Sequence, residues 1–435
     1  MMGSVSAGQA RPTSGAGSGR WAASRPGAPR RAAPSASTGA STSTGVRPLQ
    51  PFELERFFAK YEFCTRHLLC CSDCEPVHLR ELLALADEDS LARWEALSLG
   101  YTESPGLPAL REEVASMYEG VSPDEVVIGA PEELIYLTMR ALLQPGDEVI
   151  VTYPGYQSLY EIAQSIGCRV RFWEPATDES GQLAFHVLGD GTASLQAMIT
   201  EARPALIVAN FPHNPTGKSL LAADWAAVGA LAGEAGATLF SDEMYRLLEP
   251  DSAVRLPAAV DAFPAAGVSL AGVSKTIGLP GLRIGWVATH NSALAARVLE
   301  LKDYTTICAS APSEVLALMG LRASEPLLTA NLAHIAASTD LLAPLFERHA
   351  DILAWDPPTA GSTAFPRFLG DDLPGVDELA ALAVEREGVL ILPGSVYGCD
   401  RLTSERRFRL GLGRAKQDEA VAAFGRFLDE RPWQR

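Results

Sequence analysis

The chain has 435 residues, of which 47% are hydrophobic and 20% charged, a composition typical of a globular enzyme. That length allows more than one domain and a sizeable core. The formal net charge of −17 argues against nucleic acid and anionic membrane surfaces as partners. No apolar stretch approaches the ~18 residues that are needed to cross a bilayer.

The first 47 residues differ in kind from the rest. They contain six arginines, no lysine and no acidic residue, and they are rich in Ser, Ala, Gly, Pro and Thr. Because such a segment cannot bury a core, residues 1–48 are predicted to be a disordered or transit-like leader. An Arg-rich, acid-poor composition is also typical of transit peptides. We expect a cytoplasmic protein, or one of the plastid or mitochondrial matrix if residues 1–47 are a transit peptide.

The seven cysteines are odd in number, and most lie in apolar segments. This pattern argues against a disulfide framework and favours a reducing compartment. The spacing Cys71-x-x-Cys74 permits zinc binding. A second pair of this kind is missing, so no metal site is predicted.

The folded sequence is expected to begin near Pro51, with apolar residues at helical spacing in several early segments. Helices are predicted at 52–61, 77–86 and 108–118, with a short extended segment at 99–103. Further on, apolar runs bounded by turn residues predict strands at 126–129, 149–152, 205–209, 237–240, 268–270 and 284–288, and helices at 132–143 and 159–166. Short apolar strands that alternate with helices indicate an α/β fold with a mostly parallel central sheet and helices on both faces.

Beyond about Ser310 the alternation changes to a long helical stretch followed by mixed elements. We expect a helix at 376–385, strands at 389–392 and 407–412, and a closing helix at 417–428. These elements indicate a smaller C-terminal α+β domain. The predicted organisation is an N-terminal arm at 49–98, a large domain at 99–305 and a small domain at 306–435.

Lys275 follows a strand-like apolar run, and Arg283 comes eight residues later, beyond a Pro-Gly turn. A buried lysine amine can form a Schiff base with an aldehyde cofactor. An arginine can hold a phosphate with two parallel hydrogen bonds. The alternative is a surface lysine beside a salt-bridged arginine.

Polar residues also follow two earlier predicted strands. Asn214 comes after 205–209, whereas Asp242 and Tyr245 come after 237–240. Because open α/β sheets bind ligands at the carboxyl ends of their strands, we expect these side chains to lie near Lys275. Each motif alone is weak, but their combination in this order is specific.

The ordered motifs resemble the class I and II aminotransferases of fold type I, over about residues 52–430. A narrower likeness, to capreomycidine synthase-like members, is carried by residues 210–215, 274–286, 302–304 and 363–368. The resemblance implies an aspartate aminotransferase-like fold, pyridoxal 5'-phosphate as cofactor and a homodimer with shared active sites. It also implies amino transfer between an L-amino acid and a 2-oxo acid. The alternative is a lyase or cyclase that acts on an arginine-derived amino acid.

The resemblance implies roles around the cofactor ring. Lys275 carries the cofactor and later moves the substrate's α-proton. Asp242 keeps the ring nitrogen protonated, and Tyr245 and Asn214 donate hydrogen bonds to the phenolic oxygen. Tyr156 stacks on the ring, with a core tyrosine as the alternative.

For the phosphate, the resemblance implies Ala130-Pro131 at a helix N-terminus, together with Ser274 and Arg283. Two departures from the family pattern imply that phosphate binding depends more on Arg283. Pro131 gives up one N–H donor, and Gly272 stands where many relatives have a serine. Tyr101 matches the tyrosine that reaches the phosphate in the neighbouring subunit.

For the substrate, the resemblance implies that Arg409 binds the carboxylate, with Asn214 and His213 as further contacts. The alternative for His213 is a packed loop histidine. An acidic pocket would favour a cationic amino acid, and the candidates to line it are Asp73, Glu75 and Asp303.

Overall fold

The computed structural model describes residues 45–177, 182–189, 191 and 193–434, all within one compact unit of residues 38–435. Residues 1–44 of the predicted leader lie outside the described residues. Arg47 was also predicted to belong to the leader, but it is part of the fold. Its Nη1 and Nη2 atoms bind the Glu161 carboxylate at 2.7 and 2.8 Å.

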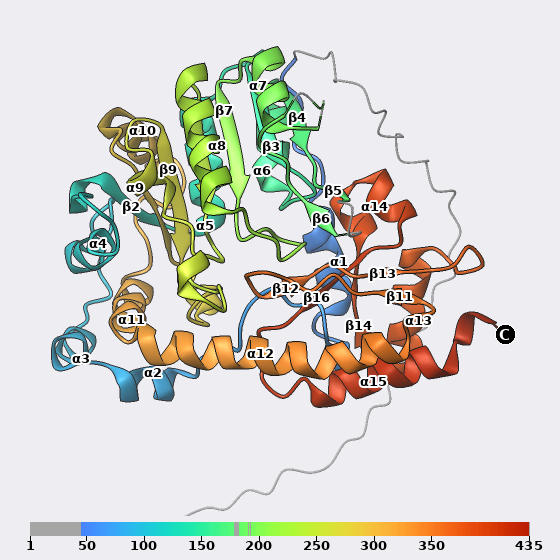
Figure 1. Cartoon of the computed structure of the whole chain (residues 1–435). Coiled ribbons are helices and arrows are strands. Elements are labelled where there is room, and N and C mark those ends of the chain that lie inside the picture. Colours follow the sequence, from blue (N-terminus) through green and yellow to red (C-terminus); the bar gives the residue numbers. More distant parts are fainter. Residues whose placement is uncertain (1–44, 178–181, 190, 192, 435) are drawn as a thin grey trace, which may run out of the picture. The chain divides into compact units, whose positions relative to one another are not determined.

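The central sheet has seven strands (Figure 1), and its architecture confirms the predicted fold class. In spatial order the strands are β2 (Val126–Gly129), β10 (Gly285–Ala288), β9 (Gly267–Gly272), β8 (Thr238–Asp242), β7 (Leu206–Asn210), β3 (Glu148–Thr152) and β4 (Arg169–Trp173). Strand β10 pairs antiparallel with both its neighbours, and the other paired strands are parallel. The parallel strands therefore end at one common edge of the sheet.

Helices cover both faces of this sheet (Figure 1). In β7, Leu206 and Val208 pack on the side of α5 (Pro131–Leu142), α6 (Ser158–Ile166) and α10 (Ser292–Lys302). The alternate residues, Ile207 and Ala209, pack on the side of α7 (Leu195–Ala202), α8 (Ala222–Ala235) and α9 (Ala259–Ala262). Burial on both faces explains why the strands appear in the sequence as continuous apolar runs.

Edge strand β4 was missed by the sequence prediction because its pattern is not that of a buried strand. Arg169 and Arg171 alternate with apolar residues, and both arginines bind Glu148 of β3. Helices α7, α8 and α10 were also missed. The predicted extended segment at 99–103 forms no strand in the structure.

The C-terminal part shares its core with the N-terminal segment. Strand β1 (His67–Leu68) pairs in parallel with β14 (Val389–Leu390). The other strands are β11 (Leu353–Ala354) with β13 (Arg367–Phe368), and β12 (Thr363–Ala364) and β15 (Leu392–Pro393) on either side of β16 (Phe408–Gly411); a separate hairpin joins β5 (Ala176–Thr177) to β6 (Leu183–Ala184). The helices are α12 (Ser324–Arg348), α13 (Val376–Glu387), α14 (Asp400–Ser404) and α15 (Asp418–Glu430). The predicted domain boundaries remain predictions.

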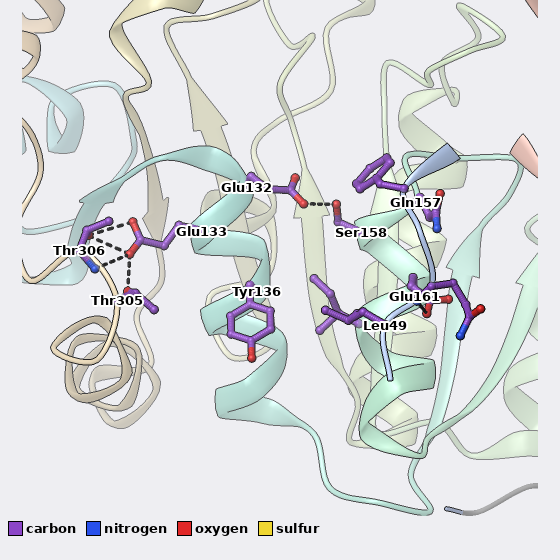
Figure 2. A pocket seen from close by; sticks show the side chains of 12 residues that line it. Leu49, Glu132, Glu133, Tyr136, Gln157, Ser158, Glu161, Thr305 and Thr306 are labelled. Carbon is purple, nitrogen blue, oxygen red and sulfur yellow. Dashed lines mark hydrogen bonds between the residues drawn. The ribbon is translucent and has the colours of Figure 1, made fainter. Parts of the chain in front are cut away.

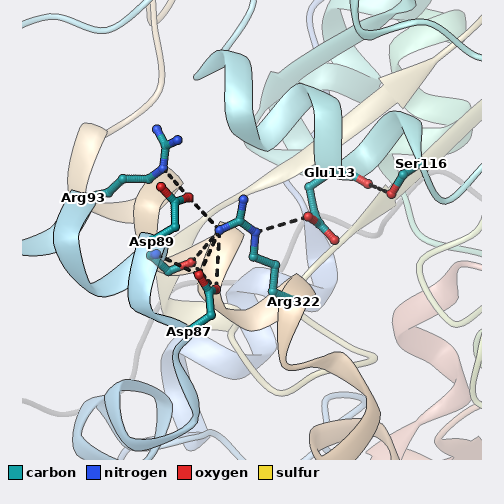
Figure 3. Close-up of polar contacts among 7 residues, drawn as sticks. Asp87, Asp89, Arg93, Glu113, Ser116 and Arg322 are labelled. Atoms are coloured by element: carbon teal, nitrogen blue, oxygen red, sulfur yellow. Dashed lines mark hydrogen bonds and ion pairs between the residues drawn. The ribbon is translucent and has the colours of Figure 1, made fainter.

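Four short helices complete the fold beside β2, with α1 (Glu53–Tyr61) preceding them. They are α2 (Leu79–Leu85), α3 (Glu88–Glu95), α4 (Pro108–Ala115) and α11 (Ala311–Arg322). Arg322 at the end of α11 binds Asp87 and Asp89 of the α3 region and Glu113 of α4 (Figure 3). Among the described residues, no helix is both long enough and apolar enough to cross a membrane.

Candidate functional site

A cavity of about 350 Å³ lies where the ends of β8 and β9 meet the N-terminal and C-terminal segments. Nine of the residues to which the family resemblance gives a catalytic, cofactor-binding or substrate-binding role line it: Pro131, Tyr156, Asn214, Asp242, Tyr245, Ser274, Lys275, Arg283 and Arg409. The structure therefore brings together side chains that are far apart in the sequence. Pro131 and Arg409, for example, are 278 positions apart. This convergence follows from parallel strands that end at one edge of the sheet.

Lys275 follows β9 and reaches into the cavity. Its Nζ donates a hydrogen bond to Ser72 Oγ at 3.3 Å. Burial lowers the pKa of the Lys275 amine; the charge of Asp73 opposes this effect, and the charge of Arg409 adds to it. A lowered pKa increases the unprotonated fraction, which is the form that attacks an aldehyde.

Asp242 is the last residue of β8 and is buried. Its Oδ1 accepts a hydrogen bond from the Met244 backbone N–H at 3.1 Å. Burial raises the pKa of this carboxyl to about 7. Asn210, at the end of neighbouring β7, donates to the Asp242 carbonyl oxygen at 3.0 Å and accepts from the Asn214 backbone N–H at 2.9 Å. Asn210 therefore fixes the ends of two strands and the following loop relative to one another.

Tyr245 lies three residues beyond Asp242 and is buried as well. Burial raises the pKa of its phenol to about 12, and a hydrogen bond with Ser72 acts in the opposite direction. The phenol therefore stays protonated near neutral pH and can act as a hydrogen-bond donor inside the cavity. Ser72 contacts both Tyr245 and Lys275, so the loop that contains it belongs to the site.

Arg409 of β16 is only 1% exposed, yet it has no carboxylate partner among the described residues. Its Nε donates to the Cys70 carbonyl oxygen at 3.1 Å. Its Nη1 donates to Asn214 Oδ1 and to the hydroxyl of Tyr397, both at 3.1 Å. A buried guanidinium held only by neutral groups is a strong site for an incoming carboxylate.

Ser274, Arg283 and the N-terminus of α5 lie at another side of the cavity. Pro131 is the first residue of this twelve-residue helix and packs closely on Gly285. A Cβ added at Gly272 would lie 3.0 Å from the Ile284 carbonyl oxygen, so a side chain there would require the backbone of β10 to give by a few tenths of an ångström. The close pairing of β9 with β10 thus disfavours a larger residue at position 272.

Three predicted site residues do not line the cavity. His213 is buried beside Phe185, its Nδ1 is 2.8 Å from Thr216 Oγ1, and burial lowers its pKa to about 3. This position corresponds to the alternative of a packed loop histidine. Ala130 precedes α5 as its N-cap residue. Tyr101 is 94% exposed and is not among the residues that line the cavity of its own chain.

The acidic residues proposed for the pocket are also separated. Asp73 lines the cavity, whereas the Glu75 carboxylate accepts a hydrogen bond from the Ala415 backbone N–H at 3.0 Å. Asp303 ends α10 and does not line the cavity. Five residues that line the cavity or support Arg409 were not predicted: Glu55, Phe58 and Glu62 of the first helix and its C-cap, together with Glu132 and Tyr397. The spacing of the first three, on one stripe of a helix, was the available signal.

The loop that contains Ser72 also carries three buried free thiols, those of Cys70, Cys71 and Cys74. Cys71 lines the cavity, and Cys70 and Cys74 lie behind it. Within the described residues, no group of three or more His, Cys, Asp and Glu side chains is arranged to hold a metal ion.

Comparison with known proteins identifies relatives of one kind. The family model for aminotransferase class I and II matches residues 92–424. Capreomycidine synthase of Streptomyces vinaceus is 30% identical over 361 residues, which cover 82% of this chain and 87% of that enzyme. A PLP-dependent aminotransferase from Streptococcus suis superposes with a TM-score of 0.78 at 25% identity, covering 88% of this chain and 99% of the other. The PLP-dependent cyclase OrfR gives 0.77 at 27% identity, covering 88% and 98%.

The cavity fits pyridoxal 5'-phosphate, the cofactor of these relatives. Ser274 is 3% exposed, and its Oγ has no hydrogen-bond partner within the described part of the chain. Arg283 forms no ion pair there either. A phosphate group near the N-terminus of α5 would give both side chains a partner. Lys275 and Asp242 supply the amine and the carboxylate that the aldehyde and the ring nitrogen require.

Proposed function

The chain belongs to the class I and II aminotransferases and uses pyridoxal 5'-phosphate, and from this premise we propose that it transfers an amino group between an L-amino acid and a 2-oxo acid. The observation that carries the proposal is that Lys275, Asp242 and Arg409 line one cavity. When bound, the cofactor supplies the electron sink for the negative charge that develops at the substrate's α-carbon.

The side chains have separate tasks in this proposal. Lys275 holds the cofactor and, once released, moves the proton from the substrate's α-carbon, a role for which its lowered pKa suits it. Asp242 holds a proton on the ring nitrogen, and Tyr245 and Asn214 bind the phenolic oxygen. Arg409 orients the substrate by its carboxylate. Tyr156 packs on the ring, and its hydroxyl donates to Glu55 at 3.4 Å.

The covalent part of the proposal is tested by reduction and mass spectrometry. Borohydride treatment of the holoenzyme followed by digestion should yield a Lys275 peptide that carries the mass of the reduced cofactor. Lys275→Ala should lose that mass and the associated visible absorbance, whereas Lys60→Ala, at an exposed lysine of α1, should keep both. Cofactor mass on another lysine would contradict the assignment.

A lyase or cyclase that acts on an arginine-derived amino acid is the second candidate. Two observations favour it: the likeness to capreomycidine synthase and OrfR, and the carboxylates in the cavity wall. The two reactions differ in stoichiometry. Transamination without a 2-oxo acid stops after one turnover per site, whereas elimination or cyclisation continues without an acceptor. Product formation from each amino acid, with and without added 2-oxo acid, separates them.

We also propose that the enzyme is a homodimer in which Tyr101 enters the partner's site. Tyr304 and Tyr101 are 91% and 94% exposed, which is unusual for such large side chains. Lys302 connects their loops, since its Nζ donates to the Ser104 carbonyl oxygen at 2.5 Å and to that of Ile307 at 3.4 Å. An apolar surface of this kind supports contact with a second copy.

A surface pocket of about 480 Å³ lies next to the same loop (Figure 2). Its wall includes Thr305 and Thr306, which bind Glu133, and Tyr136 of α5. Glu132 borders both this pocket and the Lys275 cavity, so a segment that filled the pocket would reach the edge of the catalytic cavity.

Mixed dimers test the shared site. Lys275→Ala and Tyr101→Ala homodimers should both be impaired, and their mixture should regain part of the activity because one site per hybrid is intact. Sedimentation of the wild type should give twice the chain mass. A monomeric wild type, or no recovery in verified hybrids, would refute the proposal.

A further inference from the structure

We propose that Glu62, with Glu55 at the mouth of the cavity, forms a subsite for the terminal cation of a basic L-amino acid substrate. The inference rests on the proposed function, since it assigns a substrate class to the same cavity. The subsite would accept a guanidinium or an ammonium at the end of an aliphatic side chain.

The first helix positions this subsite. Glu55, Phe58 and Glu62 stand at positions i, i+3 and i+7, which places them on one stripe of α1 and its C-cap. All three line the cavity, and a helical rise of 1.5 Å per residue sets the Cα atoms of Glu55 and Glu62 roughly 10 Å apart along the axis. A flexible charged side chain can therefore meet either carboxylate.

Glu62 differs from Asp73 and Glu132, two other carboxylates of the cavity, in its contacts. Asp73 is bound by Arg414 at 2.8 Å, and Glu132 accepts a hydrogen bond from Ser158. Among the described residues, Glu62 forms no ion pair. Burial and the negative charge of Asp73 raise the pKa of the Glu62 carboxyl, and the positive charges of Arg414 and Lys275 only partly oppose them. A cation bound here would stabilise the charged form of Glu62.

Arg409, which also lines the cavity, indicates the same basic amino acid ligand. Arg409 is buried without a carboxylate partner in the described part of the chain, so the cavity presents a cation and separate anions to one molecule. Phe58 lies between them, with its ring centre 5.9 Å from the Arg409 guanidinium carbon. The apolar side chains of Phe58 and Leu54 suit an aliphatic stem. A carboxylate, a stem and a terminal cation together describe a basic amino acid.

Ligands that lack the α-amino group test the subsite without chemistry at the cofactor. Calorimetric titration of the holoenzyme should show δ-guanidinovalerate binding about tenfold tighter than δ-ureidovalerate, its neutral analogue, as one charge-assisted hydrogen bond would produce. Glu62→Gln should remove most of this preference, and Glu55→Gln part of it. Glu234→Gln, at an exposed position of α8, should retain it. Melting temperature and cofactor absorbance verify that each variant is folded and loaded.

Equal binding of the two acids to the wild type would overturn the subsite, and so would an unchanged preference in the Glu55→Gln, Glu62→Gln double variant. Failure of the proposed function gives a different result. In that case no L-amino acid, basic or neutral, would pass its amino group to an added 2-oxo acid, whatever the calorimetric preference between the two acids.

Discussion

The guanidinium of Arg409 and the side-chain amide of Asn214 are joined by a hydrogen bond of 3.1 Å between Nη1 and Oδ1. This bond connects the C-terminal strand β16 to the loop after β7. Because the amide oxygen accepts from Arg409, the amide nitrogen is the atom of Asn214 that can donate to the cofactor. In the proposed function, one side chain would therefore couple the position of the substrate carboxylate to that of the cofactor ring.

The Tyr397 hydroxyl contacts both Arg409 and Asn214. Loss of this hydroxyl should weaken substrate binding more than it slows turnover. Its hydroxyl accepts from Arg409 Nη1 at 3.1 Å and donates to Asn214 Oδ1 at 3.4 Å. Tyr397→Phe should raise KM about tenfold, since a hydrogen bond to a charged group is lost, and should change kcat by less. Steady-state kinetics measure the split. Tyr160→Phe, which removes a hydroxyl outside the pair, serves as the control; equal effects on KM and kcat would argue for a role in the chemical step.

Asp242 should make the cofactor-free protein less stable as the pH rises. Its pKa is about 7 in the fold, against an ordinary value of 3.8, so the folded state holds a proton that the unfolded chain releases earlier. The stability it contributes is complete below about pH 4 and is lost as the pH rises through about 7, by up to roughly 4 kcal/mol.

Urea unfolding of the cofactor-free wild type and of Asp242→Asn, at about pH 5 and about pH 8, measures this effect. The wild type should lose more stability than the variant between the two values. Asp340→Asn, at an exposed position of α12, should behave like the wild type. Cofactor binding should reduce the difference, because a protonated ring nitrogen stabilises the ionised carboxylate. Identical pH profiles for wild type and Asp242→Asn would contradict the assignment.

The sequence predicted much of the catalytic side of the cavity because each residue there follows a recognisable strand. Asn214, Asp242 and Lys275 come after β7, β8 and β9, and parallel strands place their ends together. The order of the motifs was therefore sufficient to predict their convergence. The same reasoning failed for His213, which follows β7 too but turns into the core beside Phe185.

The substrate side could not be predicted in this way because it depends on contacts between distant segments. Glu62 follows the first helix and Arg409 lies in the last strand, and no local pattern indicates that they border one cavity. Tyr397 lies in the 3-10 turn Gly394–Tyr397, which has no motif of its own. Such placements arise from the shared core of the N-terminal and C-terminal segments, visible only in three dimensions.

Arg47 should anchor the helix that carries the proposed subsite. It binds the Glu161 carboxylate through two nitrogens, and the Gln50 backbone N–H donates to the same carboxylate at 2.7 Å. Arg47→Ala would leave a buried carboxylate without its cation and should lower the free energy of unfolding by about 1–3 kcal/mol. Amino acid affinity should fall as well, because the segment leads directly into α1. Arg56→Ala, on the exposed side of α1, should change neither; unchanged affinity in Arg47→Ala would show that α1 is held by its own packing.

Arg322 joins three helices, and its contribution to stability should depend on salt and pH. It lies 3.2, 2.9 and 3.3 Å from carboxylate oxygens of Asp87, Asp89 and Glu113. Arg322→Met keeps the aliphatic stem but leaves the three carboxylates to repel one another, so thermal unfolding should show a loss of about 1 kcal/mol, the scale of partly exposed ion pairs. The loss should shrink in high salt, because exposed charges are screened.

The pH dependence of the same variant has a defined sign. Burial raises the pKa of Asp87, but hydrogen bonds from Ser90 and the charge of Arg322 outweigh it and hold the value at about 2. A carboxyl with a depressed pKa contributes stability above its ordinary value of 3.8 and loses it as the pH falls through about 2. The difference between wild type and Arg322→Met should therefore be complete near neutral pH and vanish in strong acid. Arg297→Met, which breaks an exposed pair within α10, should show little effect at any pH, so a similar loss there would mean that the network adds nothing beyond single surface pairs.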